Sequence, residues 1–529
     1  MAEALGPFQA SVAATRAVAD NPRYLSGWHT GENSAPVTAR RDDVRMHQAY
    51  AVDVPRRPVA ALEDVIGHER TSRVLGAAAD FRRAFHGRVV WNVSSTAAGG
   101  GVADMLQVLV GYTKDLAVDV RWLVIGGDPE FFRITKRVHN WIHGHAGDGG
   151  DLGAPELGHI RDVMSDNAAS VADEVSAGDV VLLHDPQTAG LAEAFARRGA
   201  HVVWRSHIGM DEANELSRAA WAFLLPLLDG AEAYVFTRAS YAPAMLSPQQ
   251  VWIIPPSIDP FSPKNQWMDP ANVRAAIGQI GAVAGQFGGP VCRYTRRDGS
   301  PGELRHPASV AAEALPGPDD PVVVQVSRWD RLKDMSGVMR GFAEHVAPYG
   351  PGWLMLVGPS VEGVTDDPEG ALVFAETLAD WRNLPPEQRS RVVLVNLPMA
   401  DADDNACMVN ALQRHATVIV QKSLVEGFGL TVAEGMWKGR PVVGSAVGGI
   451  QDQITAETGI LLPEPTDLPA FGRAVRGLLD DRDAAETMGA AAHEYVRTHY
   501  VGDLHLLRYA ELFGTLLASE ARTGSRAVT

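Results

Sequence analysis

The sequence predicts an α/β protein made of two doubly wound, Rossmann-like domains that face each other across a cleft. Two series of short apolar runs alternate with helical segments, the first between residues 88 and 254 and the second between 321 and 462. Such alternation is typical of parallel sheets covered by helices. A chain of 529 residues is also too long for one ordinary domain, so each series is expected to form its own.

The first series predicts a domain over residues 86–260. An Ala- and Arg-rich N-terminal extension, residues 1–85, precedes it and carries no motif. Three glycines, 99–101, separate the first expected strand from a helix over 102–114. Strands are expected at 88–93, 120–125, 179–183, 201–204, 233–236 and 251–254.

The second series predicts a domain over residues 321–487. Residues 261–320 are rich in Gly, Pro and Ala and are expected to be an insertion or a long linker. The last segment, 488–529, has helical spacing of apolar residues, and a return to the N-terminal domain is one option for it. Strands are expected at 321–326, 353–357, 391–395, 416–420, 441–443 and 459–462.

Composition excludes several classes of partner. A formal charge of −17 argues against nucleic-acid binding. No apolar run approaches the roughly 20 residues that a membrane-spanning helix needs, and no signal-peptide pattern opens the chain. Cys292 and Cys407 are the only cysteines, too few for a disulfide scaffold or a thiolate metal cluster. We expect a cytoplasmic protein without a membrane partner, with a homodimer as one option for its oligomeric state.

Two carboxylates, Glu426 and Glu434, stand around a Gly-Phe-Gly turn between an expected strand and a helix expected over 431–438. Ligands of open α/β sheets bind where strands end, and a helix N-terminus attracts phosphate. Carboxylates beside a phosphate are suited to accept hydrogen bonds from sugar or ribose hydroxyls, so the run suggests a sugar nucleotide. In the alternative, Glu426 caps the turn and Glu434 is a solvated acid near the helix start.

A basic pair, Arg328 and Lys333, follows the strand expected at 321–326. Their spacing lets both reach one diphosphate, with Arg as a planar fork and Lys as a point charge. Either residue alone would be an ordinary surface charge, whereas together with the two glutamates they indicate a phosphate site. The run Asp401-Ala-Asp403 is expected to cap a helix rather than bind a metal. No metal and no other cofactor are therefore expected.

The chain resembles retaining GT-B glycosyltransferases of family 4 and, among them, the trehalose glycosyltransferring synthases. The most specific block is 426–449, and the N-terminal extension and the segment after Pro263 depart from the family. The resemblance implies a GT-B fold and a retaining transfer of glucose from a nucleoside diphosphate glucose to glucose, giving trehalose. The matching blocks are 92–106, 130–140, 184–188, 204–207, 325–328, 366–370 and 426–449.

By the same resemblance, the diphosphate would be held by Arg328 and Lys333, the ribose by Glu434 and the transferred sugar by Glu426. His184 would meet the donor sugar near the reacting carbon, although a buried, satisfied histidine is the alternative. The implied catalytic residues are His184, Arg328, Lys333 and Glu426. The remaining implied donor-side residues are Gly99, Gly100, Gly101, Gly427, Phe428, Gly429 and Leu430.

Acceptor-side residues are expected on the first domain. A tight turn remains the alternative for the glycine triplet, and an ordinary polar cluster remains the alternative for the residues after the strand at 201–204. Trp437 is expected to pack under its helix rather than stack on a base. The expected acceptor-side residues are Glu130, Lys136, Asn140, Asp185, Arg205 and His207, with His139 beside them.

The expected partners are small sugars and a sugar nucleotide. The nearest rival is a retaining trehalose phosphorylase, which needs the same anion contacts. Others are a family 4 transfer to a different acceptor and a non-catalytic sugar-nucleotide sensor that kept the fold. The sequence identifies neither the donor base nor the acceptor, and it leaves the reaction direction open.

Overall fold

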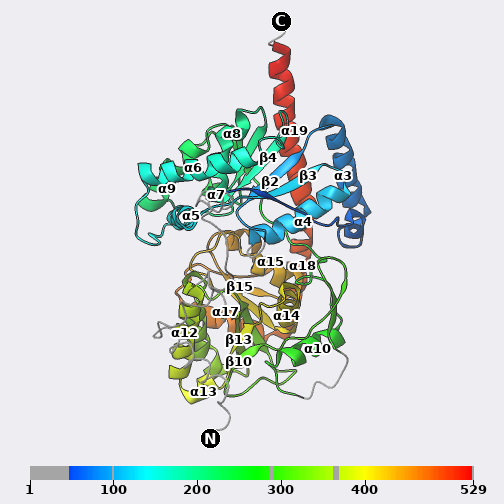
Figure 1. Ribbon diagram of the computed structural model, residues 1–529. Coiled ribbons are helices and arrows are strands. Elements are labelled where there is room, and N and C mark those ends of the chain that lie inside the picture. The colour runs from blue at the N-terminus through cyan, green and yellow to red at the C-terminus, as the bar shows by residue number, and fades with distance from the viewer. Residues whose placement is uncertain (1–46, 98–100, 286–290, 362–367, 527–529) are drawn as a thin grey trace, which may run out of the picture. The chain divides into compact units, whose positions relative to one another are not determined.

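The computed structural model describes residues 47–97, 101–285, 291–361 and 368–526. Gly99 and Gly100, residues 1–46 of the expected extension and the start of the block at 366–370 lie outside the described residues. The segment Met46–Thr529 forms one unit, in which two Rossmann-like domains are distinguished (Figure 1). In the described ranges, no helix has both the length and the apolar character needed to cross a membrane.

The first domain is built on a seven-stranded sheet in the order β1-β3-β2-β4-β5-β6-β7. Every neighbouring pair is parallel except β1 and β3. The chain leaves β2 towards one edge and returns to build the other edge from β4, so the topological switch point lies between these strands. The strands are β1 (Tyr50–Val52), β2 (Val90–Ser94), β3 (Val120–Val124), β4 (Val180–His184), β5 (His201–Arg205), β6 (Ala231–Phe236) and β7 (Val251–Ile253).

Helices cover both faces of this sheet, which is why its central strands are buried throughout. One core lies between the sheet and α3, α4 and α19. The other lies between the sheet and α5, α6, α8 and α9. The helices are α3 (Glu63–Ala84), α4 (Gly101–Asp115), α5 (Pro129–Ile142), α6 (Ala154–Ser170), α7 (Asp185–Thr188), α8 (Ala192–Ala196), α9 (Glu215–Leu224) and α19 (Gly502–Arg526).

The second domain also has seven strands, in the order β10-β13-β12-β11-β14-β15-β16. All pairs are parallel except β10 with β13. The run from β13 to β16 has the strand order of a dinucleotide-binding Rossmann sheet, with the switch point between β11 and β14. The strands are β10 (Ser309–Ala311), β11 (Val322–Val326), β12 (Trp353–Pro359), β13 (Val392–Leu397), β14 (Val418–Gln421), β15 (Val442–Ser445) and β16 (Gly459–Leu462).

The sheets confirm the predicted fold class, and every expected strand is present. The expected helix over 431–438 corresponds to α15, and Asp401 caps α14 by accepting hydrogen bonds from the N–H groups of Asp403 and Asp404. The second domain's remaining helices are α11 (Met335–His345), α12 (Pro368–Asn383), α13 (Pro386–Arg389), α14 (Ala402–His415), α15 (Leu430–Trp437), α16 (Ile450–Gln453), α17 (Leu468–Asp480) and α18 (Arg482–His499).

Residues 261–320, expected as an insertion or linker, pack into the second domain. Helix α10 (Pro270–Ile280) contributes Ile277 to the same core as α14, and β10 extends the sheet beside β13. A hairpin of β8 (Arg293–Thr295) and β9 (Pro301–Glu303) carries Arg297, which pairs with Asp403 at 3.1 Å and with Asp104 of α4 at 3.0 Å. The described part of this segment is therefore an integral part of the second domain, not a linker.

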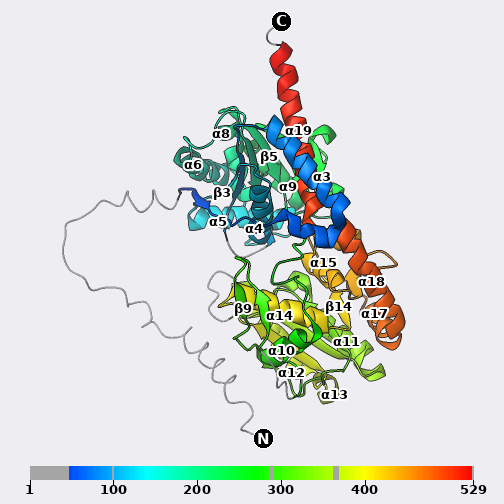
Figure 2. The same ribbon diagram turned by 90° about the vertical axis from the view of Figure 1, so that its right-hand side faces the viewer.

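The first and last segments that the structure describes both join the first domain. β1 extends the first sheet, and α3, from the same expected extension, lies along α19 (Figure 2). Helix α19 places Leu512 and Phe513 in a core of the first sheet. Helix α18 belongs to the second domain and α19 to the first, so the C-terminal segment crosses from the second domain to the first.

Candidate active site

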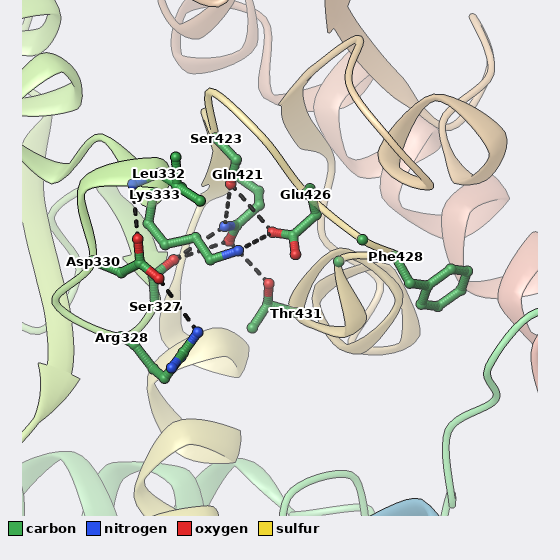
Figure 3. A network of polar contacts seen from close by, with 12 residues as sticks. Ser327, Arg328, Asp330, Leu332, Lys333, Gln421, Ser423, Glu426, Phe428 and Thr431 are labelled. Atoms are coloured by element: carbon green, nitrogen blue, oxygen red, sulfur yellow. Dashed lines mark hydrogen bonds and ion pairs between the residues drawn. The ribbon is translucent and has the colours of Figure 1, made fainter. Parts of the chain in front are cut away.

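An ion pair joins the ends of two neighbouring strands at the second switch point. Lys333, in the short turn after β11, lies with its Nζ 2.7 Å from Oε2 of Glu426, which follows β14 (Figure 3). The hydroxyl of Ser423 donates to the same oxygen at 3.3 Å. The two charged side chains are only 16% and 13% exposed, so water screens them little. The two residues predicted to hold diphosphate and sugar are therefore in contact.

Arg328 lies on the same loop and is less constrained. Its guanidinium contacts Asp330 at 3.3 Å and its side chain is 66% exposed (Figure 3). The other carboxylate oxygen of Asp330 accepts the N–H of Leu332 at 2.8 Å, which fixes the turn that leads to Lys333. A long exposed contact of this kind contributes little to stability, so Arg328 is free to turn towards an anionic ligand.

A buried amide ties the loops of the site together. Gln421, at the end of β14, accepts a hydrogen bond from the Thr431 hydroxyl at 2.9 Å and donates to the hydroxyls of Ser327 and Ser423 at 3.1 and 3.0 Å (Figure 3). Gly429, which precedes α15, has a φ of 85° that side chains other than glycine rarely adopt. The start of α15 is therefore held at a fixed position beside the ion pair.

Glu434 lies four residues into α15 and is 5% exposed. Its Oε1 lies 3.5 Å from Nζ of Lys264, whereas Oε2 is buried with no hydrogen-bond partner among the described residues. Glu434, Lys264 and Leu430 line an open-sided cavity of about 660 Å³ that also reaches Gly101 and Asp104. An unpaired buried carboxylate oxygen is costly, so this position suits a ligand that donates a hydrogen bond.

Two histidines stand at the carboxyl ends of β4 and β5 in the first sheet. Nδ1 of His184 lies 2.9 Å from Nε2 of His207, and the rings stack with centroids 5.2 Å apart. Nε2 of His184 lies 3.3 Å from the side-chain oxygen of Asn92. Burial and the nearby charge of Arg205 lower the pKa of both imidazoles well below the usual value, so both are neutral at neutral pH.

Asp185 follows His184 with a strained backbone, because its φ of 64° is rare for a residue with a side chain. Its Oδ1 accepts the N–H of His207 at 2.8 Å, and its carbonyl accepts the indole N–H of Trp204 at 3.1 Å. Burial raises the pKa of the Asp185 carboxyl to about 7. Asp185 thus fixes the loop that bears His207.

Arg205 does not fit the acceptor-side position expected for it. Its guanidinium donates to the carbonyl of Ile254 at 3.1 Å, lies 2.9 Å from Nε2 of His505 and bonds the hydroxyl of Tyr509. The last two belong to α19, and Arg205 is fully buried. Alternation along β5 turns Val203 and Arg205 to the face that α19 covers, while Trp204 enters the opposite core. Arg205 therefore connects the first sheet to α19.

The expected residues of α5 divide into two groups. Glu130, at the N-terminal end, pairs with Arg133 at 2.6 Å on the surface, so the structure gives no support to an acceptor contact for it. Lys136 is exposed. Burial lowers the pKa of His139, and the positive charges of Lys136 and of Arg328 in the second domain lower it further. Asn140 is half-buried one residue further on. His139 therefore lies within electrostatic range of Arg328.

The aromatic residues near α15 are structural. Trp437 donates its indole N–H to the carbonyl of Asn265 at 3.0 Å and stacks on His493 at 4.4 Å. Phe428 is 6% exposed and packs edge-on against Tyr500 at 5.4 Å. The expectation that Trp437 packs under its helix agrees with these contacts, whereas Phe428 supplies backbone rather than its ring to the loop of Glu426.

Two glycines bring the domains close together. A Cβ on Gly427 would lie 3.2 Å from the carbonyl oxygen of His207, and one on Gly101 would lie 3.6 Å from the Leu430 side chain. The start of α4 therefore lies opposite the start of α15. Of the three expected glycines, only Gly101 is placed.

Three side chains of the first domain that were not expected from the sequence make polar contacts with the second domain. The hydroxyl of Tyr241, after β6, lies 2.9 Å from the carbonyl of Glu426 and 2.7 Å from that of Gly427. Asp211 accepts the N–H of Gly448 at 2.8 Å, and Arg238 pairs with Asp452 at 2.9 Å. No motif marks these residues, because each acts through a partner about two hundred positions away.

Considered together, these groups place positive charge, a helix N-terminus and two carboxylates after strands β11 and β14. Arg328, Lys333 and the N-terminus of α15 are suited to a diphosphate. Glu426 and Glu434 are suited to hydroxyls on either side of it. Among the described residues, no group of three or more His, Cys, Asp or Glu could hold a metal ion.

Comparison with known proteins gives a consistent result. Residues 92–243 match the family described as "Trehalose synthase, N-terminal domain", and residues 404–495 match "Glycosyl transferases group 1". A trehalose synthase of Pyrococcus horikoshii is 32% identical over 89% of this chain and 99% of its own length. A trehalose phosphorylase of Pleurotus pulmonarius is 25% identical over 77% of this chain and 54% of its own length.

The fold has solved counterparts. A structure of an α,α-trehalose-phosphate synthase (UDP-forming) from Burkholderia xenovorans in complex with glucose-6-phosphate aligns with a TM-score of 0.59 and 14% identity. The alignment covers 82% of this chain and all of that one. At 14% identity, this likeness concerns the two-domain fold alone.

Proposed function

The chain belongs to the trehalose synthase family of GT-B glycosyltransferases, and on that premise we propose that it moves glucose from a nucleoside diphosphate glucose to the anomeric hydroxyl of glucose, giving trehalose. The observation that carries the proposal is the 2.7 Å contact between Lys333 and Glu426 at the second switch point. In the proposal, Lys333 is the cation that binds the diphosphate and Glu426 is the carboxylate that binds sugar hydroxyls, so their contact supports a site where a sugar and its leaving group are held side by side.

Stabilisation of the leaving group is the first task of the site. When the bond between the anomeric carbon and the diphosphate breaks, negative charge develops on the phosphate oxygens. Arg328, Lys333 and the N–H groups at the start of α15 are positioned to stabilise that charge. Because the positive charges of Arg328 and Lys333 can stabilise the leaving diphosphate, we propose that the reaction needs no metal or other cofactor.

Retention follows from attack on the face that the leaving group vacates. The anomeric hydroxyl of the acceptor forms the new bond to the sugar carbon, and its proton passes to the departing phosphate oxygen. No side chain then needs to act as base, which suits a site whose two central imidazoles are neutral and hydrogen-bonded to each other. The protein contributes by holding the acceptor hydroxyl on the same face of the sugar as the leaving group.

The preference for a nucleotide donor rests on Glu434. Glu434 lines the cavity next to the start of α15, and its Oε2 is buried without a hydrogen-bond partner among the described residues, so we propose that a ribose hydroxyl of the donor satisfies this oxygen. Glucose 1-phosphate, the substrate of a trehalose phosphorylase, has no ribose to satisfy this oxygen. Phosphorolysis is therefore our second candidate, and the likeness to a trehalose phosphorylase keeps it in view.

The test is incubation of the purified protein with glucose and, separately, ADP-, UDP- or GDP-glucose, without added metal. Release of one nucleoside diphosphate together with a trehalase-sensitive product is the expected result, and it would identify the donor base. Nucleotide release without trehalose would indicate another acceptor. Turnover only with glucose 1-phosphate would replace the proposal by phosphorolysis. Binding of a nucleotide without any turnover would indicate a sensor.

A further inference from the structure

Asp211, in the loop after β5, joins the first domain to the second. Its Oδ2 accepts the backbone N–H of Gly448 at 2.8 Å and the side-chain amide of Gln451 at 3.2 Å. Its other carboxylate oxygen pairs with Arg238 of the first domain, whose guanidinium also pairs with Asp452 at 2.9 Å. The Asp211 carboxylate is therefore held by its own domain on one side and accepts hydrogen bonds from the other domain on the other side.

Gly448 packs directly against the backbone of the loop that carries Glu426. A Cβ on Gly448 would lie 1.7 Å from the carbonyl oxygen of Glu426. The next N–H, that of Gly449, donates to the carbonyl of Gly427 at 3.1 Å. Gly448 is buried and has a φ of 51°, which residues with a side chain rarely adopt. A shift of Gly448 would therefore also shift the backbone that bears the Glu426 carboxylate.

The hydrogen bond between Asp211 and Gly448 is suited to fix this contact. A carboxylate accepts a stronger hydrogen bond than a neutral oxygen does, and buried N–H groups are rarely left unpaired. Arg238, whose side chain is 16% exposed, restrains the Asp211 carboxylate from the first domain. Because a partly exposed ion pair contributes little by itself, the contact that matters most is the one with the buried N–H of Gly448.

We propose that Asp211 is a positioning residue of the transfer reaction, and that its hydrogen bond to Gly448 sets the position of Glu426. The inference rests on the proposed function, because it takes Glu426 to bind the transferred sugar. Asp211 itself touches no substrate in this account and acts through the loop of Glu426. A misplacement of about 1 Å at a reacting centre can cost about a hundredfold in rate, so even a small shift of this loop is measurable.

The experiment compares Asp211→Ala, Asp211→Asn and a matched control, Arg497→Met. Arg497 of α18 donates to the carbonyl of Val65 in α3 at 3.3 Å, so the control removes a different polar contact between the domains. Asp211→Ala is expected to lower kcat about tenfold, while the dissociation constant of the nucleoside diphosphate, measured by calorimetry, stays within about threefold. Asp211→Asn should recover part of the loss because its amide oxygen can accept the N–H of Gly448. Arg497→Met should match the wild type.

A double-mutant cycle and hydrogen exchange distinguish positioning from a general loss of structure. If Asp211 acts through Glu426, Asp211→Ala should lower kcat by no more than about threefold in a Glu426→Gln background. Hydrogen–deuterium exchange, followed by mass spectrometry, should be faster in Asp211→Ala than in the wild type over residues 422–430 and 445–454. The same peptides should exchange at the wild-type rate in Arg497→Met.

Each outcome separates the two proposals. A wild-type kcat in Asp211→Ala, the same loss in the Glu426→Gln background, or an equal loss in Arg497→Met would overturn the role of Asp211 while leaving the transferase intact. A wild-type protein that releases no nucleotide would overturn the proposed function. Hydrogen exchange would then decide whether Asp211 positions the loop of Glu426, with faster exchange in Asp211→Ala supporting that role and unchanged exchange overturning it.

Discussion

Replacement of Lys333 by Met removes the cation that contacts Glu426 while keeping most of the side chain's volume. We propose that Lys333 is one of two basic residues for the leaving diphosphate, and in the structure its Nζ lies 2.7 Å from Glu426. Loss of one such charge-stabilising contact costs about 2–4 kcal/mol of transition-state stabilisation. At 1.36 kcal/mol for each factor of ten, kcat/KM should fall about 30- to 900-fold.

The same change leaves Glu426 with Ser423 as its hydrogen-bond partner. Because the pair is partly exposed, the free energy of unfolding should fall by about 1–3 kcal/mol, less than for a fully buried pair, and the variant should stay folded. Nucleotide release under saturating glucose measures the activity, and denaturant unfolding measures the stability. Arg331→Met is the matched control, since Arg331 lies two residues away and pairs with Glu376 on the surface at 2.8 Å; it should retain wild-type activity.

A double-mutant cycle separates two roles for Lys333. If Lys333 acts only by holding Glu426, Lys333→Met has no further effect in a Glu426→Gln background. If it also contacts the diphosphate, as proposed, the double variant should be at least tenfold less active than Glu426→Gln alone. A folded Lys333→Met variant with more than a third of wild-type kcat/KM would refute the reasoning.

Three further changes probe other parts of the site. Glu434→Gln should raise the dissociation constant of the nucleoside diphosphate about tenfold, measured by calorimetry, because an amide accepts a weaker hydrogen bond than a carboxylate; unchanged affinity would remove Glu434 from the ribose site. Tyr241→Phe, which deletes the hydroxyl at the carbonyls of Glu426 and Gly427, should lower kcat several-fold in a steady-state assay while the protein remains folded; a fully active variant would contradict a positioning role. The Asp185 carboxyl has a pKa of about 7 in the folded protein and an ordinary value of 3.8 when unfolded, so its contribution to the free energy of unfolding should decline as the pH rises between these values. Asp185→Asn should lack this decline when urea unfolding is measured across pH 4.5–8. Parallel curves of unfolding free energy against pH for wild type and variant would contradict the raised pKa of Asp185.

The two-domain fold and the ion pair were open to prediction because both depend on local patterns. Continuous apolar runs between helical segments predict buried parallel strands. Arg328, Lys333, Glu426 and Glu434 follow strands in that pattern, so the ends of β11 and β14 bring them to one place. Such a pattern can be recognised from neighbouring residues alone, without knowing which distant residues come into contact.

The missed features depend on distant contacts. β1 has only three residues, two of them exposed, so no apolar alternation marked it. Arg205 stands at the end of an expected strand, as an active-site residue would. Its partner on α19 becomes known only from the packing of α19 against the first sheet. The partner of Tyr241 is two backbone carbonyls, which no sequence motif can indicate.

The most direct test of the central claim is the structure of the product formed from glucose labelled with carbon-13 at its anomeric carbon and an unlabelled nucleoside diphosphate glucose. The account predicts a single disaccharide in which both anomeric carbons are α-linked through one oxygen and only one carries the label, seen by nuclear magnetic resonance. A β-linked product would contradict retention. Release of free unlabelled glucose with the nucleotide, and no disaccharide, would contradict transfer to glucose.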